Sequence, residues 1–92
     1  MKKRANIVKR KGHLEEYDEK KVYGSCYAAC SAAQLTSKEC EAIAEAVTKE
    51  VNKKVRAKPK ITSTEIFHTV VRHLKKHNKE VAFLYETHRD VS

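Results

Sequence analysis

The segment from Thr36 to Val51 constrains the fold more than any other part of the chain. Thr36, with Glu39 three residues later, matches a capping box, in which the two residues satisfy free backbone amides at the start of a helix. The apolar residues of this segment recur with the 3.6-residue period of an amphipathic helix. The segment therefore predicts a helix with one buried face, formed by Cys40, Ile43, Ala44, Val47 and Val51.

Three other segments carry helix signals of the same kind. Asp18 is a candidate N-cap for a helix of roughly 15 residues, which contains Gly24 as a local weakness of about 1 kcal/mol relative to alanine. Thr62 and Glu65 match a second capping box. Asn78 is expected to cap a last helix. The predicted inner faces are Val22, Cys26, Cys30 and Ala33, then Ile66, Val70 and Leu74, and finally Val81, Ala82, Tyr85 and His88.

The start of the chain carries a β-hairpin signal. Ile7–Arg10 and His13–Tyr17 are short candidate strands, and Lys11-Gly12 lies between them, where a tight turn favours positive φ. Ile61 is available as a short edge strand beside this hairpin. The pattern predicts an α+β, mainly α fold: a four-helix bundle capped by an N-terminal β-hairpin, with a small three-stranded sheet as its extended form.

The length of 92 residues allows one hydrophobic core and one domain. We expect a basic tail at residues 1–6, a domain at residues 7–92, and a linker from Lys53 to Lys60 that contains the only proline, Pro59. No apolar run approaches the roughly 20 residues that span a bilayer, and no apolar segment follows the basic N-terminus as in a secretory signal. These features predict a cytoplasmic protein without a membrane contact.

The charge of the chain points to a polyanionic ligand. The net charge is +8, and residues 1–12 hold six cations and no acid, so the other eighty residues carry fourteen cations against twelve acids. A second basic cluster lies at residues 53–60. Basic clusters attract nucleic acids, acidic membranes and nucleotide phosphates, and charge alone does not choose among them.

Several kinds of chemistry find no support in the sequence. Two glycines, Gly12 and Gly24, cannot supply the glycine-rich turns of a P-loop or a dinucleotide-binding motif, and no nucleophile elbow is present. His73 and His77 have helical i, i+4 spacing but lack the further ligands of a zinc motif. The three cysteines are not spaced as a disulfide framework and are expected to be buried thiols. We therefore predict no enzyme activity and no metal site.

Three separated motifs resemble the ATP-cone family, the regulatory nucleotide-binding domain of ribonucleotide reductases and of a repressor of reductase genes. The first is I-V-K-R-K-G-x-x-E-x-Y-D-x-x-K-V at residues 7–22, and the others are ITSTEI at residues 61–66 and VAFLYETHR at residues 81–89. Together they extend over roughly residues 5–90 in the family's order. The resemblance implies a non-catalytic module that binds ATP or dATP, with or without Mg2+, between a β-cap and the helix ends.

The resemblance also implies a role for each matched residue. Lys9 and Arg10 would reach the phosphates from the hairpin, with Lys21 helping from the first helix. Glu15 and Asp18 would face the ribose or the adenine edge. The base would be enclosed by Ile7, Val8, Tyr17, Val22 and Ile66, and the phosphate side would be completed by Thr62, Ser63 and His88.

Three interpretations remain open at this stage. In the first interpretation, binding of a nucleotide signals through altered oligomerisation or docking on a protein partner. The alternative is a nucleic-acid-binding protein that uses the basic tail and the cluster at residues 53–60, although only six aromatic residues are available for stacking. A third is a cone that kept the fold as an interaction surface and lost its ligand.

Overall fold

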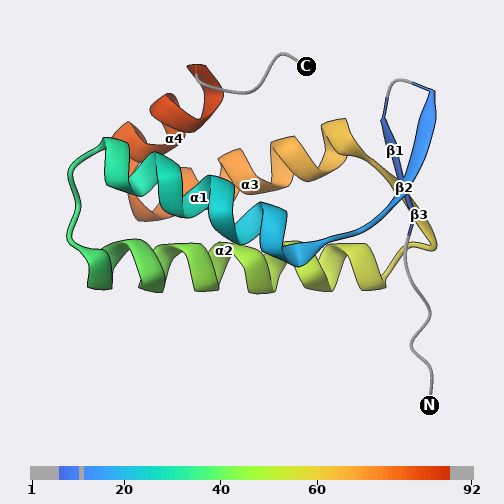
Figure 1. Ribbon diagram of the computed structural model, residues 1–92, viewed down its shortest axis with the longest axis horizontal. Helices are drawn as coiled ribbons and strands as arrows, with labels where there is room; N and C mark the ends of the chain where they lie inside the picture. Colours follow the sequence, from blue (N-terminus) through green and yellow to red (C-terminus); the bar gives the residue numbers. More distant parts are fainter. Residues whose placement is uncertain (1–6, 11, 88–92) are drawn as a thin grey trace.

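The computed structural model describes residues 7–10 and 12–87, which form four helices and three strands (Figure 1). The strands are β1 (Ile7–Arg10), β2 (His13–Glu16) and β3 (Lys60–Thr62). The helices are α1 (Glu19–Ala32), α2 (Ser37–Arg56), α3 (Ser63–His77) and α4 (Lys79–Thr87). The predicted fold class, mainly helical with a small sheet, is confirmed.

The sheet lies at one end of the bundle, and α4 lies at the other (Figure 1). β1 is the central strand: it pairs antiparallel with β2 and parallel with β3. Ile61 therefore does add an edge strand, as the sequence predicts, and it lies opposite Val8. Gly12, in the turn between β1 and β2, has a φ of 86°, the positive value that the hairpin requires.

The helix starts follow their predicted caps. Asp18 accepts a hydrogen bond from the Lys20 amide, and Asn78 accepts one from the Glu80 amide. The capping box at Thr36 is complete, with both reciprocal hydrogen bonds formed.

At Thr62 only half of the predicted capping box forms. The Thr62 hydroxyl accepts a hydrogen bond from the Glu65 amide, but the Glu65 carboxylate accepts one from Lys58 at 3.0 Å instead of turning back to the start of the helix. The cation supplies a charge-assisted partner, which is stronger than a neutral amide.

The predicted linker at residues 53–60 is wrong in its first half. α2 continues to Arg56 because Val55 extends the apolar spacing of Val47 and Val51 by one more turn and is only 1% exposed. Lysines on the solvent side of a helix do not interrupt it, and cations in the last turn favour its C-terminus. The connection to β3 is therefore confined to residues 57–59.

The turn from α1 to α2 has a left-handed residue that the sequence does not signal. Gln34 has a φ of 66°, and the Leu35 amide donates to the Cys30 carbonyl while the Gln34 amide donates to the Ser31 carbonyl. This double hydrogen-bond pattern is a Schellman motif, in which glycine is the usual left-handed residue.

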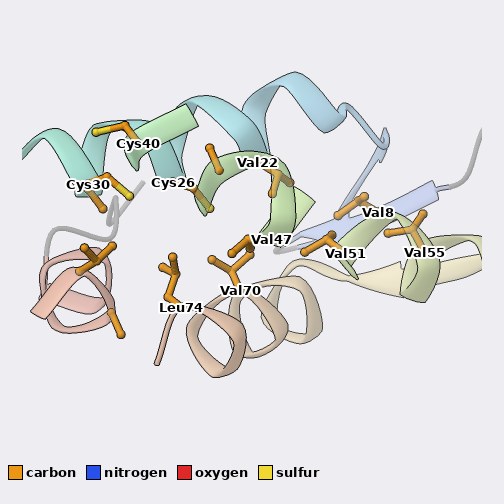
Figure 2. Close-up of a cluster of buried hydrophobic side chains, with 14 of the residues drawn as sticks. Val8, Val22, Cys26, Cys30, Cys40, Val47, Val51, Val55, Val70 and Leu74 are labelled. Atoms are coloured by element: carbon orange, nitrogen blue, oxygen red, sulfur yellow. The ribbon is translucent and has the colours of Figure 1, made fainter. Parts of the chain in front are cut away.

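One hydrophobic core runs through the bundle and reaches the sheet (Figure 2). It joins the predicted apolar faces, and the three cysteines are buried in it as free thiols. Because Val8 and Ile61 belong to the same cluster, the sheet is packed on the helices and not simply attached to them. The labelled members are Val8, Val22, Cys26, Cys30, Cys40, Val47, Val51, Val55, Val70 and Leu74.

Candidate functional site

The register of the sheet brings Lys9 beside the start of α3. Lys9 pairs with Thr62, and Thr62 is both the last residue of β3 and the N-cap of α3. Val8 and Ile61 are buried on one face of the sheet, so strand alternation puts Lys9 and Thr62 on the opposite face. An exposed cation therefore lies next to a helix N-terminus, and both favour an anion.

Two further residues share this face of the sheet. Lys60 lies two residues before Thr62 and is exposed, which adds a second cation near Lys9. Leu14 pairs with Lys9 across the hairpin and is 61% exposed, so apolar surface lies next to the cations. Sequence reasoning missed both residues as site candidates. The alternation around Ile61 could have identified Lys60, whereas the position of Leu14 depends on the hairpin register.

The junction between β2 and α1 carries the predicted polar residues. Asp18 caps α1, and its side chain accepts from the Lys20 amide at 3.0 Å. Lys21 lies in the first turn of α1 and is exposed. Glu15, also exposed, pairs with Val8 across the hairpin. The cap role of Asp18 is confirmed, and the ligand contacts of these residues stay predictions.

The predicted base-binding residues differ in how much surface they retain. Val8 and Val22 are each 7% exposed and belong to the hydrophobic core. Tyr17 and Ile66 are only partly buried and pack against that core from its edge. Among these four side chains, Tyr17 and Ile66 keep more surface with which to contact a base.

The start of α3 carries one more predicted residue and one ion pair. Ser63, the first residue of α3, is partly exposed. The Lys58 ammonium lies 3.0 Å from a Glu65 oxygen, and its hydrogen bond lowers the pKa of that carboxyl. Lys58 is thus partly neutralised as a contributor to the basic cluster at residues 53–60.

Part of the predicted set lies outside the described structure. His88 is beyond the described residues, and Ile7 and Arg10 are described only as backbone of β1. Their expected contacts with a base or a phosphate therefore stay predictions. Within residues 7–10 and 12–87, no group of three or more histidine, cysteine, aspartate or glutamate residues is placed to hold a metal ion.

A chain of two hydrogen bonds joins the β2–α1 junction to α2. The Tyr17 hydroxyl donates to Asn52 Oδ1 at 2.7 Å, and Asn52 Nδ2 donates to Glu19 Oε1 at 2.7 Å. Burial, with the nearby Glu19 and Asp18 carboxylates, raises the pKa of Tyr17 from 10.0 to about 12. Sequence reasoning missed Asn52, because nothing local distinguishes an asparagine on the polar side of a helix.

A groove of about 360 Å³ lies between α1 and α2 beside this hydrogen-bonded chain. None of the predicted site residues lines it. The Thr48 hydroxyl beneath it is buried and has no hydrogen-bond partner. The lining residues are Glu19, Lys20, Tyr23, Glu45, Thr48, Lys49 and Asn52.

The described helices include none that is both long and apolar enough to cross a lipid bilayer. Comparison with protein-family models gives a match to the model described as "ATP cone domain" over residues 5–91. This match covers nearly the whole chain, including the sheet and all of the described helices. No curated protein matches the sequence.

Proposed function

Because the chain belongs to the ATP-cone domain family, a family of nucleotide-binding regulatory domains, we propose that it binds ATP or dATP at the sheet end of the bundle. The family match over residues 5–91 is the observation that carries the proposal. The site would lie where β1 meets the first turns of α1 and α3. The chain itself would carry out no catalysis and would act as a regulatory module.

The charge arrangement at the sheet supports a triphosphate there. Lys9 and Lys60 are exposed on the same face of the sheet, and Thr62 caps the start of α3 beside them. The free amides of a helix start and its partial positive charge favour phosphate oxygens. Each cation–phosphate pair at about 4 Å contributes at most about 4 kcal/mol before desolvation. A few such pairs are enough for micromolar affinity, about −8 kcal/mol, without a P-loop.

The partly buried side chains at the junction support a purine on the other side of the phosphates. The Tyr17 ring and Ile66 offer apolar surface at the edge of the core. Glu15 and Asp18 would accept hydrogen bonds from the amino group of adenine or from ribose hydroxyls. Mg2+, where it accompanies the nucleotide, would be held mainly by the phosphates, because Mg2+ keeps several waters and is usually bound through substrate phosphates.

The proposed signal is a shift between arrangements of the hairpin and the helices. A ligand moves such an equilibrium only by the difference in its affinity for the two arrangements. Bound nucleotide would therefore change self-association or docking on a protein partner by favouring one of them. The three buried free thiols are compatible with a reducing compartment, and we propose the cytoplasm as the location.

Nucleotide titration tests the proposal directly. Isothermal calorimetry with ATP, dATP and GTP, each with and without Mg2+, should give a dissociation constant in the micromolar range for the adenine nucleotides and a weaker one for GTP. At a hundred times this constant, ATP should stabilise the fold by about 2.7 kcal/mol. For a domain of this size, that corresponds to a rise in Tm of about 10–20 °C.

A pair of double variants locates the site. Lys9→Ala/Arg10→Ala should abolish most of the ATP-dependent rise in Tm. The matched control, Lys75→Ala/Lys76→Ala, removes the same charge from exposed positions in the last turn of α3 and should keep the response. An unchanged response in the first variant, or an equal loss in both, would reject the site. Size-exclusion chromatography with and without ATP then tests the proposed change in self-association.

The acidic neighbours of the basic cluster at residues 53–60 weaken the case for the alternative function, nucleic-acid binding. Lys53 lies 3.5 Å from Glu50, and Lys58 lies 3.0 Å from Glu65, so two of its cations already have acidic neighbours. A steep fall of DNA or RNA affinity with salt, combined with no response to ATP, would favour this alternative over nucleotide binding.

A further inference from the structure

Asn52 joins three elements that meet beside the proposed nucleotide site. It lies on α2, and its side chain bonds Tyr17, just after β2, and Glu19, the first residue of α1. The partners are 35 and 33 residues away in the sequence. Each heavy-atom distance is 2.7 Å, which is typical for the bond from the Tyr17 hydroxyl and at the short end for the bond from the Asn52 amide. This side chain therefore links the connection between hairpin and helix to the body of the bundle.

The chemistry of the three groups determines the direction of both hydrogen bonds. An ionised Glu19 carboxylate only accepts, so the Asn52 amide nitrogen must face it. The Asn52 oxygen then faces Tyr17, whose hydroxyl must donate to it. A tyrosine hydroxyl is protonated at neutral pH, so the donor is present, and burial raises the pKa of Tyr17 further, to about 12. The Asn52 side-chain amide carries both a donor and an acceptor, so it can make both bonds at once.

From this geometry we infer that Asn52 is a positioning residue of the nucleotide site, which acts by holding the Tyr17 ring against the edge of the core. This inference rests on the proposed function. Tyr17 is followed by Asp18 and, in the first turn of α1, by Lys21. Orientation of Tyr17 by Asn52 therefore also restrains the backbone that carries the two polar residues. Asn52 itself touches no ligand and acts through Tyr17.

Three single variants separate the two bonds. Asn52→Leu removes both, Tyr17→Phe removes the bond to Asn52 and keeps the aromatic ring, and Asn52→Asp keeps the acceptor for Tyr17 but faces Glu19 with a second carboxylate. We expect Asn52→Leu and Tyr17→Phe each to weaken ATP binding about fivefold, the worth of one net hydrogen bond. The Tyr17→Phe/Asn52→Leu double variant should also lose only about fivefold in ATP affinity, because both changes break the same hydrogen bond and their effects are not additive.

Asn52→Asp distinguishes positioning from general stability. It should keep an ATP affinity close to that of the unchanged chain, although its Tm falls at least as far as that of Asn52→Leu because two carboxylates face each other. An ATP affinity of Asn52→Asp as low as that of Asn52→Leu would overturn the inference. Fully multiplicative losses in the double variant would overturn it as well.

Val81→Ala serves as the control for loss of stability. Val81 is fully buried in α4, at the end of the bundle away from the sheet (Figure 1). Measured well below its own Tm, this variant should bind ATP with unchanged affinity. An equal loss in Val81→Ala would show a global effect and overturn the role of Asn52.

The failure of the proposed function and the failure of the positioning role give different results. If the unchanged chain does not bind ATP, the proposed function fails, and the positioning role fails with it. If the unchanged chain binds ATP and the Asn52 variants bind it equally well, only the positioning role fails.

Discussion

Substitution of glycine by alanine should have opposite effects on stability at the two glycines of the chain, Gly24 and Gly12. Gly24 lies inside α1 with no positive φ, and a Cβ built on it would meet nothing within 4 Å. Glycine in an exposed helix costs stability relative to alanine, because the unfolded chain loses more backbone freedom on folding. Gly24→Ala should therefore stabilise the domain. The open surroundings show that no close backbone neighbour requires glycine there.

The expected gain for Gly24→Ala is the full difference in helix propensity. With no steric cost to subtract, the free energy of unfolding should rise by about 0.8–1.0 kcal/mol. This corresponds to a rise in Tm of about 4–8 °C in a domain of this size. Urea denaturation followed by circular dichroism should show a higher midpoint with an unchanged slope, because the surface exposed on unfolding is unchanged.

Gly12→Ala is the matched counterpart. A Cβ at Gly12 also meets nothing within 4 Å, but the residue has a φ of 86°. This left-handed conformation costs an alanine roughly 1–2 kcal/mol, so the variant should unfold at lower urea concentration. A lower midpoint for Gly24→Ala, or a higher one for Gly12→Ala, would refute the reasoning from backbone conformation and open space.

The remaining predictions concern buried polar and ionisable groups. Thr48→Val should raise the free energy of unfolding by about 1 kcal/mol, because it removes a buried hydroxyl without a partner. Thr69→Val should give no gain in urea denaturation, because the Thr69 hydroxyl donates to the Glu65 carbonyl at 2.8 Å; equal gains in both variants would contradict this explanation. Burial raises the pKa of the Cys26 thiol from 9.0 to about 12, so with rising pH the thiol ionises first in the unfolded chain. The contribution of this thiol to the free energy of unfolding is therefore complete below about pH 9 and is lost as the pH rises toward 12. Urea denaturation between pH 8 and 11 should show a steeper decline than in Cys26→Ala, and equal slopes would count against it.

Most of the helical part of the fold could be predicted from local sequence. The caps at Asp18, Thr36 and Asn78 all form, because an N-cap side chain bonds amides only two or three residues away. The apolar period likewise predicts the buried faces, because a helical face is formed by residues only three or four positions apart. The predicted linker begins too early, at Lys53, because a run of lysines is typical of a linker, whereas Val55 continues the apolar period and α2 ends at Arg56.

The site was less predictable than the fold. The family motifs identify Lys9, Tyr17 and Thr62 as candidates, but they do not show that Lys9 pairs with Thr62 across the sheet. Asn52 has no local signal, since its two partners lie 33 and 35 residues away. The lining of the α1–α2 groove was missed for the same reason, because it combines residues from two helices.

The sequence by itself determines the elements of this protein and its family, because caps, periodicity and motifs act over a few residues. Tertiary structure alone decides the parallel pairing of β1 with β3, the contact of Asn52 with the β2–α1 junction and the position of Lys9 beside the start of α3. These features join segments that are brought together only by burial of one shared core, and no local pattern records which polar groups meet at its edge.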